Sequence, residues 1–87
     1  MSEEAELARI REFVRRRFPL ARQLAAGDDD PLLESGVVDS LGILELVQYV
    51  TQEFAVEVGD EDLLPDNFGT VRKLAAFVAA KRDGKPR

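Results

Sequence analysis

Residues 36–54 read GVVDSLGILELVQYVTQEF and contain the clearest helical pattern in the chain. Four apolar residues recur at the spacing i, i+4, i+7 and i+11, which places them on one face of a helix: Ile43, Val47, Val50 and Phe54. The pattern predicts a helix over residues 40–54 with this stripe buried. Leu41, Leu44 and Glu45 fall off the stripe, so we expect them on the exposed side.

Asp39 and Ser40 stand at the start of this predicted helix, after a loop that contains Gly36. Aspartate and serine commonly cap helix N-termini by accepting a hydrogen bond from a backbone N–H of the first turn. Capping is therefore one interpretation of either residue. A catalytic serine is a second interpretation, and it fails because the chain has no histidine to act as its base.

Two further helices are predicted on either side of this segment. Residues 3–17 place Leu7, Ile10 and Val14 on one face, and Pro19 argues for the end of that helix because proline disfavours helix in the residue before it. Near the C-terminus, Thr70 is the expected N-cap of a helix that runs to about residue 82. Its inward residues are expected to be Val71, Leu74, and Phe77 or Val78.

A long connection, residues 19–39, joins the first two predicted helices. It has turn residues such as Gly27 and Pro31, yet it also has apolar side chains that a solvated loop would not need: Leu32, Leu33, Val37 and Val38. We expect the connection to pack these four across the bundle, with a helical turn near residues 21–25. The acidic run at 28–30 lacks the ligand spacing of a calcium loop, so we expect it to be solvated.

The predicted fold is an all-α four-helix bundle, with a long loop between the first and second helices and a short third helix. Residues 61–64 suggest one short turn before Pro65, and residues 67–69 another. We expect one domain over residues 1–82, followed by a disordered tail at residues 83–87.

The composition argues against several functions. The 87 residues fit one small domain, and the absence of cysteine and histidine removes disulfides, thiolate zinc sites and the usual general base, so we expect neither an enzyme nor a metal site. All twelve Lys and Arg residues lie outside residues 23–71, and that acidic middle would repel nucleic acid. The arginines at 15–17 fit a solvated helix end. No apolar run approaches the roughly 20 residues that cross a bilayer, so we expect a cytoplasmic protein.

The order of elements around Asp39-Ser40-Leu41 resembles the phosphopantetheine-dependent acyl carrier family. The resemblance covers residues 11–80 and includes the long loop, the acidic turn at 60–62 and the sequence Asn-Phe-Gly-Thr-Val at 67–71. It implies that a separate transferase attaches 4′-phosphopantetheine from coenzyme A to Ser40, and that the cofactor's thiol holds an acyl or aminoacyl cargo as a thioester. It also implies that Asp39 helps to position the serine and a metal in the transferase complex, unless Asp39 serves only as a cap.

Several positions differ from the housekeeping fatty-acid carriers. Gly36 stands four residues before the serine instead of three, and Gly42 replaces an acidic residue found in many of them. Thr51 and Gln52 replace carboxylates that commonly extend the partner-binding face. These features are similar to D-alanyl carriers and to stand-alone carriers of specialised pathways.

The predicted docking face of the 40–54 helix comprises Leu41, Leu44, Glu45 and Gln48. Exposed leucines beside an attachment site favour an interface with an apolar centre, while Glu34, Asp60 and Asp62 would steer a basic partner. The expected partners are the transferase, a ligase that loads the cargo and an enzyme that accepts it, and we expect a monomer. We expect neither nucleic-acid binding nor membrane insertion. The alternative function is a helical docking domain of the same fold that is never modified.

Overall fold

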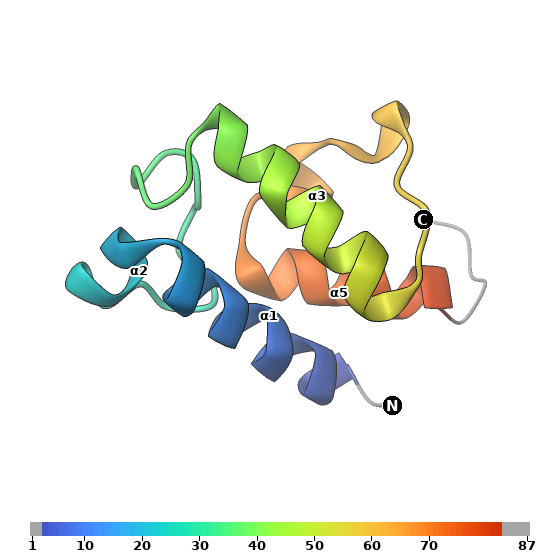
Figure 1. Ribbon diagram of the computed structural model, residues 1–87, viewed down its shortest axis with the longest axis horizontal. Helices are drawn as coiled ribbons and strands as arrows, with labels where there is room; N and C mark the ends of the chain where they lie inside the picture. Colours follow the sequence, from blue (N-terminus) through green and yellow to red (C-terminus); the bar gives the residue numbers. More distant parts are fainter. Residues whose placement is uncertain (1–2, 83–87) are drawn as a thin grey trace.

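The computed structural model describes residues 3–82, and this part of the chain contains helices and no strand (Figure 1). In chain order the elements are α1 (Glu3–Arg17), α2 (Pro19–Gln23), α3 (Ser40–Phe54), the 3-10 turn η1 (Asp60–Asp62), α4 (Pro65–Phe68) and α5 (Val71–Arg82). The predicted all-α fold and its three long helices are confirmed. The tail expected at residues 83–87 lies outside the described residues, and the domain bounds 1–82 stay a prediction.

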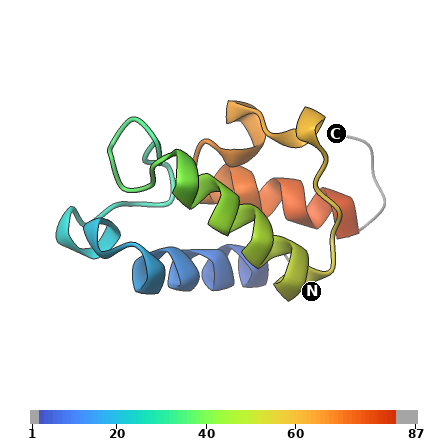
Figure 2. The ribbon, with the colours of Figure 1, turned by 45° about the horizontal axis from the view of Figure 1, so that its top comes forward.

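Three long helices form the body of the molecule. α1 packs along α5, and α3 lies across them, as both ribbon views show (Figures 1 and 2). η1 and α4 lie on the side of α3 that faces away from α1 (Figure 2). The connection at residues 24–39 closes the end of the bundle where α3 begins, and its Val38 lies against Gly42 in the first turn of α3 (Figure 1).

The core lies between α1, α3 and α5, and it corrects the predicted face of α3. Val50 and Phe54 are buried as expected, but Ile43 and Val47 are only half-buried. Leu46, which lies outside the predicted stripe, is 0% exposed. α3 has apolar residues on more than one side, and its contact with the other long helices selects a buried row spaced by four residues: Gly42, Leu46, Val50 and Phe54.

The connection before α3 packs three of its four predicted apolar residues. Leu32, Val37 and Val38 are buried, whereas the prediction for Leu33 is wrong, because that side chain is 54% exposed. The Leu32 N–H donates to the Gly69 carbonyl at 2.9 Å, and the Val38 N–H donates to the Leu32 carbonyl at 3.0 Å. These bonds fix Leu32 against the core, and the next side chain in the turn then points outward. The helical turn expected near 21–25 is present as α2.

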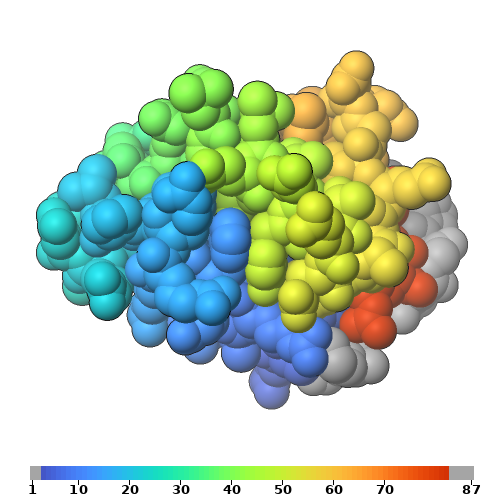
Figure 3. All heavy atoms as spheres, viewed as in Figure 1, coloured from blue at the N-terminus to red at the C-terminus, as the bar shows by residue number. Residues whose placement is uncertain are grey.

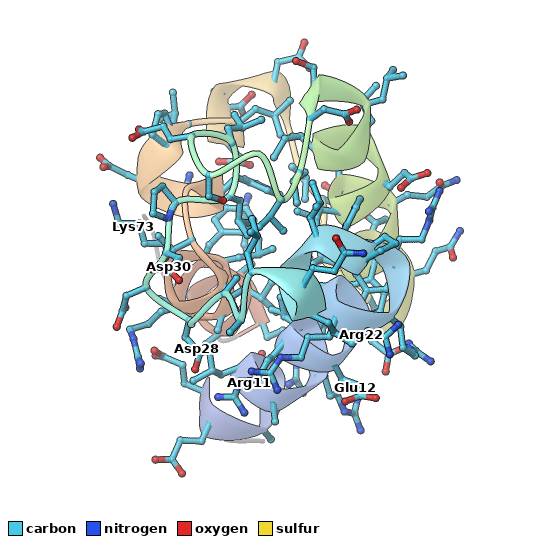
Figure 4. The ribbon with its side chains drawn as sticks, turned by 90° about the vertical axis from the view of Figure 1, so that its left-hand side faces the viewer. Arg11, Glu12, Arg22, Asp28, Asp30 and Lys73 are labelled. Carbon is cyan, nitrogen blue, oxygen red and sulfur yellow. The ribbon has the colours of Figure 1, made fainter. Side chains whose placement is uncertain are left out.

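The acidic run in this connection is solvated only in part. Asp29 and Asp30 are exposed as expected, but the carboxylates of Asp28 and Asp29 pair with arginines. Nε and Nη2 of Arg11 donate to the two carboxylate oxygens of Asp28 at 2.8 and 2.6 Å, and Figure 4 shows Arg11 on α1 beside Asp28. Nε of Arg72 donates to Oδ1 of Asp29 at 2.7 Å, and the Arg72 backbone N–H donates to the Asp28 carbonyl at 3.0 Å. The run therefore ties the connection to both α1 and α5.

We expect Asp28→Asn to lower the free energy of unfolding by about 1–2 kcal/mol at pH 7, as for other partly buried charged hydrogen bonds. The hydrogen bonds from Arg11 hold the pKa of Asp28 below its usual value, and burial opposes them more weakly. Because the folded-state pKa is the lower one, the contribution is complete above the unfolded pKa of about 4 and is lost as the pH falls through the folded value. Thermal melts of the parent and the variant at pH 7 would measure the loss of stability. Melts near pH 3 would show how much of the Asp28 contribution remains at low pH.

Asp30→Asn is the matched control, because Asp30 lies in the same run and accepts a hydrogen bond from the Gly27 N–H instead of pairing with an arginine. Equal melts for the Asp28 and Asp30 variants at pH 7 would contradict the role given to the Arg11 pair.

The segment between α3 and α5 corrects two further expectations. Residues 67–69 do not form a separate turn, because residues 65–68 form the short helix α4 with Pro65 at its start. Asp62 is buried and pairs with Nζ of Lys81 at 3.2 Å, so its carboxylate is not displayed for steering a partner. Thr70 is the cap of α5 as predicted, since its Oγ1 accepts a hydrogen bond from the Lys73 N–H at 3.0 Å.

Candidate functional site

Asp39 and Ser40 have different roles at the start of α3. Asp39 is the N-cap, and its Oδ1 accepts a hydrogen bond from the Gly42 N–H at 2.8 Å. Ser40 is the first residue of the helix and is exposed. The capping interpretation therefore holds for Asp39, which leaves the Ser40 hydroxyl available for another use.

Ser40 has the environment that covalent attachment of a phosphate-bearing group needs. Its hydroxyl forms no hydrogen bond within residues 3–82. Ser35, the other serine in this range, donates to the Leu32 carbonyl at 3.3 Å and accepts from the Val37 N–H at 3.4 Å. An anion on Ser40 would also lie at the N-terminus of a 15-residue helix, where the helix dipole favours negative charge. The site therefore fits 4′-phosphopantetheine, which would supply the thiol that the sequence lacks.

Gly42 explains one of the differences from housekeeping carriers. It is buried, and a Cβ atom there would lie 2.7 Å from Cγ1 of Val38 and 2.9 Å from Cε1 of Phe18. Such distances are too short for any side chain. Glycine lets the first turn of α3 press against these two core residues, so an acidic side chain has no space at this position.

Two hollows flank the first turns of α3. One, of about 450 Å³, lies toward η1 and α4, and its apolar walls include Leu33, Ile43, Leu63, Leu64 and Phe68. The other, of about 400 Å³, lies toward α2, and its walls include Arg17, Leu20, Leu41 and Gly42. Sequence reasoning missed the contribution of Leu20, because nothing in the long connection indicated that α2 would bring it beside the start of α3.

The residues predicted to form the docking face lie on the outer side of α3. Leu41 is 73% exposed and Leu44 is 59% exposed, and Gln48 is exposed further along the same side. Thr51 and Gln52 extend this side without charge. Glu45 differs from the others, because it lies at the edge next to α1 and pairs with Arg17. The structure thus brings the four predicted residues together, and the carboxylate of Glu45 is already paired with Arg17.

Three paired contacts join α1 and α3, and we call them the ladder: Arg17–Glu45, Phe13–Tyr49 and Arg9–Glu53. The outer two are ion pairs, with 3.1 Å between Nη1 of Arg9 and Oε2 of Glu53. The middle contact is a stack of aromatic rings whose centroids lie 4.0 Å apart. Each step moves four residues back on α1 and four forward on α3, which suits antiparallel helices. Figure 3 shows atoms of α1 and α3 meeting along this seam.

Tyr49 at the centre of the ladder behaves as a structural residue. It is partly buried, and its hydroxyl donates to the Arg9 carbonyl at 3.2 Å. Burial raises the pKa of its phenol above the ordinary value. Tyr49 is thus a partly exposed helix tyrosine whose polar tip bonds to the backbone of α1.

Within residues 3–82, no three His, Cys, Asp or Glu side chains are grouped so that they could hold a metal ion. The same range has no helix whose length and apolar character would allow it to cross a membrane.

The comparisons with known proteins agree with this site. A family model described as a phosphopantetheine attachment site matches residues 8–78. The chain is also 37% identical over 65 residues to a protein named "Probable acyl carrier protein PigG" from Serratia sp. (strain ATCC 39006), an alignment that covers 68% of this chain and 75% of that protein. The chain belongs to the phosphopantetheine-dependent carrier family.

This membership fixes the general activity of the chain. It is a carrier protein and not a catalyst, its cofactor is 4′-phosphopantetheine, and it works with phosphopantetheinyl transferases and acyl-handling enzymes. The carrier interpretation is confirmed over the alternative of a docking domain that is never modified.

Proposed function

We propose that the chain carries an acyl or aminoacyl group as a thioester on 4′-phosphopantetheine bound to Ser40. The observation that supports this residue most strongly is its exposed hydroxyl, which has no partner in the described range and stands at the N-terminus of α3. In the attachment step the Ser40 oxygen attacks the β-phosphate of coenzyme A that bears the pantetheine arm. The new ester bond forms as the bond to the nucleotide phosphate breaks, and the serine proton leaves to solvent or to the transferase.

Asp39 has two proposed contributions to this step. Its cap keeps the first turn of α3 formed, which fixes the backbone of Ser40. Its second carboxylate oxygen, Oδ2, forms no hydrogen bond within the described range, so it can turn toward a metal ion held by the transferase.

Peptide mapping tests the assignment. The chain is incubated with coenzyme A and a broad-specificity phosphopantetheinyl transferase, digested, and sequenced by tandem mass spectrometry. The proposal requires the cofactor on the peptide that contains Ser40. Cofactor on a different residue, or no uptake by a folded chain, would contradict it.

We also propose that the loading ligase and the accepting enzyme bind the docking face: Leu41, Leu44, Glu45 and Gln48. Exposed leucines beside the attachment residue support an interface with an apolar centre. The similarity to a protein named as an acyl carrier supports an acyl-type cargo. The monomeric state and the cytoplasmic location stay predictions.

We expect Leu44→Ala to reduce transfer of cargo to the cognate enzyme more than Glu45→Gln does. Leu44 is 59% exposed and near the centre of the face, whereas the Glu45 charge is already held by Arg17. The loss from Leu44→Ala should be about five- to thirtyfold, corresponding to roughly 1–2 kcal/mol at an apolar interface centre. Steady-state transfer rates at low and high salt would measure this, and the loss should persist at high salt, because apolar contacts are not screened.

A thermal melt separates this prediction from a loss of folding. Leu44→Ala should melt like the parent, since the truncated side chain lies outside the core. A larger loss of transfer for Glu45→Gln would instead show that docking depends on charge.

A further inference from the structure

Both carboxylates of α3 are neutralised by arginines of α1. α3 has two acidic residues, Glu45 and Glu53, and they are the α3 members of the two ion-pair rungs of the ladder. The remaining polar residues on its outer side, Gln48, Thr51 and Gln52, carry no charge. The exposed side of α3 therefore displays no unpaired negative charge, although the chain as a whole is acidic.

The surroundings of the Arg17 rung are apolar on the side of the attachment serine. Arg17 and Glu45 line the 400 Å³ hollow whose walls include Leu20 and Leu41. They also line a further hollow, separate from the two beside the first turns of α3. It has a volume of about 340 Å³, lies between α1 and α3, and is also lined by Phe13, Gln48 and Tyr49. The Arg17–Glu45 pair thus lies beside the surface that a partner must contact when it covers Leu41 and Leu44.

The charges around this position do not favour a basic partner. Arg16, one residue before the rung, is exposed and forms no ion pair with the residues of the described range. A cationic surface that approached Glu45 would meet Arg16 and would have to displace Arg17, and like charges in an interface are unfavourable. An apolar and uncharged surface meets neither obstacle.

We propose that Arg17 is a specificity-determining residue that withholds the Glu45 charge, so that the docking face selects enzymes with an apolar, uncharged contact surface over enzymes with a basic one. The inference rests on the proposed docking face. Specificity of this kind depends on what the surface disfavours as much as on what it attracts.

A transferase whose carrier-binding surface is basic serves as the probe, with coenzyme A as the cofactor donor. We expect Arg17→Gln to raise kcat/KM for modification of the carrier about two- to fivefold at low salt, which is the range of an exposed ion pair. The increase should disappear at high salt, where exposed charges are screened. In the double variant Arg17→Gln/Glu45→Gln the increase should be lost. Glu45→Gln in the parent should lower kcat/KM by a smaller factor than it does in Arg17→Gln, because Arg17 already holds that carboxylate in the parent.

Arg16→Gln is the matched control, because it removes the same charge from the adjacent residue without releasing Glu45. Arg16→Gln measures how much kcat/KM for a basic transferase rises when any cation near the docking face is removed. Arg17→Lys keeps a cation beside Glu45, so the transferase should modify this variant at the parental rate. Thermal melts of all variants should agree closely, since exposed pairs of this kind contribute less than about 1 kcal/mol.

The inference is overturned if Arg17→Gln and Arg16→Gln change kcat/KM equally, or if removing Glu45 has the same effect with and without Arg17. These outcomes differ from failure of the proposed function. A wrong attachment residue would appear as modification away from Ser40 in the parent, before any variant is compared.

Discussion

Ser40→Ala is expected to abolish attachment of 4′-phosphopantetheine while leaving the fold intact. The substitution removes the one oxygen that the proposed attachment uses, so no residual modification should remain even at long incubation. Its cost in stability should be small, because the hydroxyl is exposed and has no hydrogen-bond partner in the described range. Intact-protein mass spectrometry after incubation with the transferase and coenzyme A gives the readout, and far-UV circular dichroism checks the helices.

Ser35→Ala is the control for this experiment. Ser35 is also an exposed serine of the connection before α3, but its hydroxyl is engaged with the backbone of Leu32 and Val37. The Ser35 variant should take up the cofactor fully. A mass shift that persists in Ser40→Ala would show that the attachment residue has been misassigned.

Leu46→Ala should produce a large loss of stability. Leu46 is 0% exposed at the centre of the core, and truncation of such a leucine costs about 2–5 kcal/mol. A small domain with a total stability of about 5 kcal/mol would then keep little native structure. Urea or thermal unfolding followed by circular dichroism would show the change.

Leu44→Ala supplies the comparison, since it is the same truncation on the same helix at an exposed position. Its unfolding midpoint should stay within the range of surface substitutions, about 0.5 kcal/mol. Similar losses for the two variants would mean that α3 does not present the face described above.

The sequence was sufficient for the long helices because their signals are local. The spacing of apolar residues and the position of Pro19 predicted α1, and the residues Asp39 and Thr70 predicted where α3 and α5 begin. The proposed attachment residue, Ser40, also came from local information, a short motif and the order of elements around it, and it stays a prediction.

What the sequence did not predict depends on contacts between distant residues. α3 has apolar residues on more than one side, so periodicity alone could not choose Leu46 over Ile43 and Val47 as the buried centre. The pairs of Asp28 with Arg11 and of Glu45 with Arg17 join residues 17 and 28 positions apart. Such pairs leave no periodic pattern in the sequence, which is why the pairing of Asp28 and of Glu45 with arginines was not predicted.

The ladder also restricts which conformational changes the carrier can make when an enzyme binds α3. If α3 slid along α1 by one helical turn, about 5.4 Å, an arginine would face Tyr49 and Phe13 would face a glutamate, so both ion pairs would be lost. Smaller slides would pull the stacked Phe13 and Tyr49 rings out of contact. A small tilt about that stack keeps the rings together and stretches only the outer pairs. The seam therefore acts as a pivot with a fixed register, and it allows the Ser40 end of α3 to swing without letting the helix travel along its length.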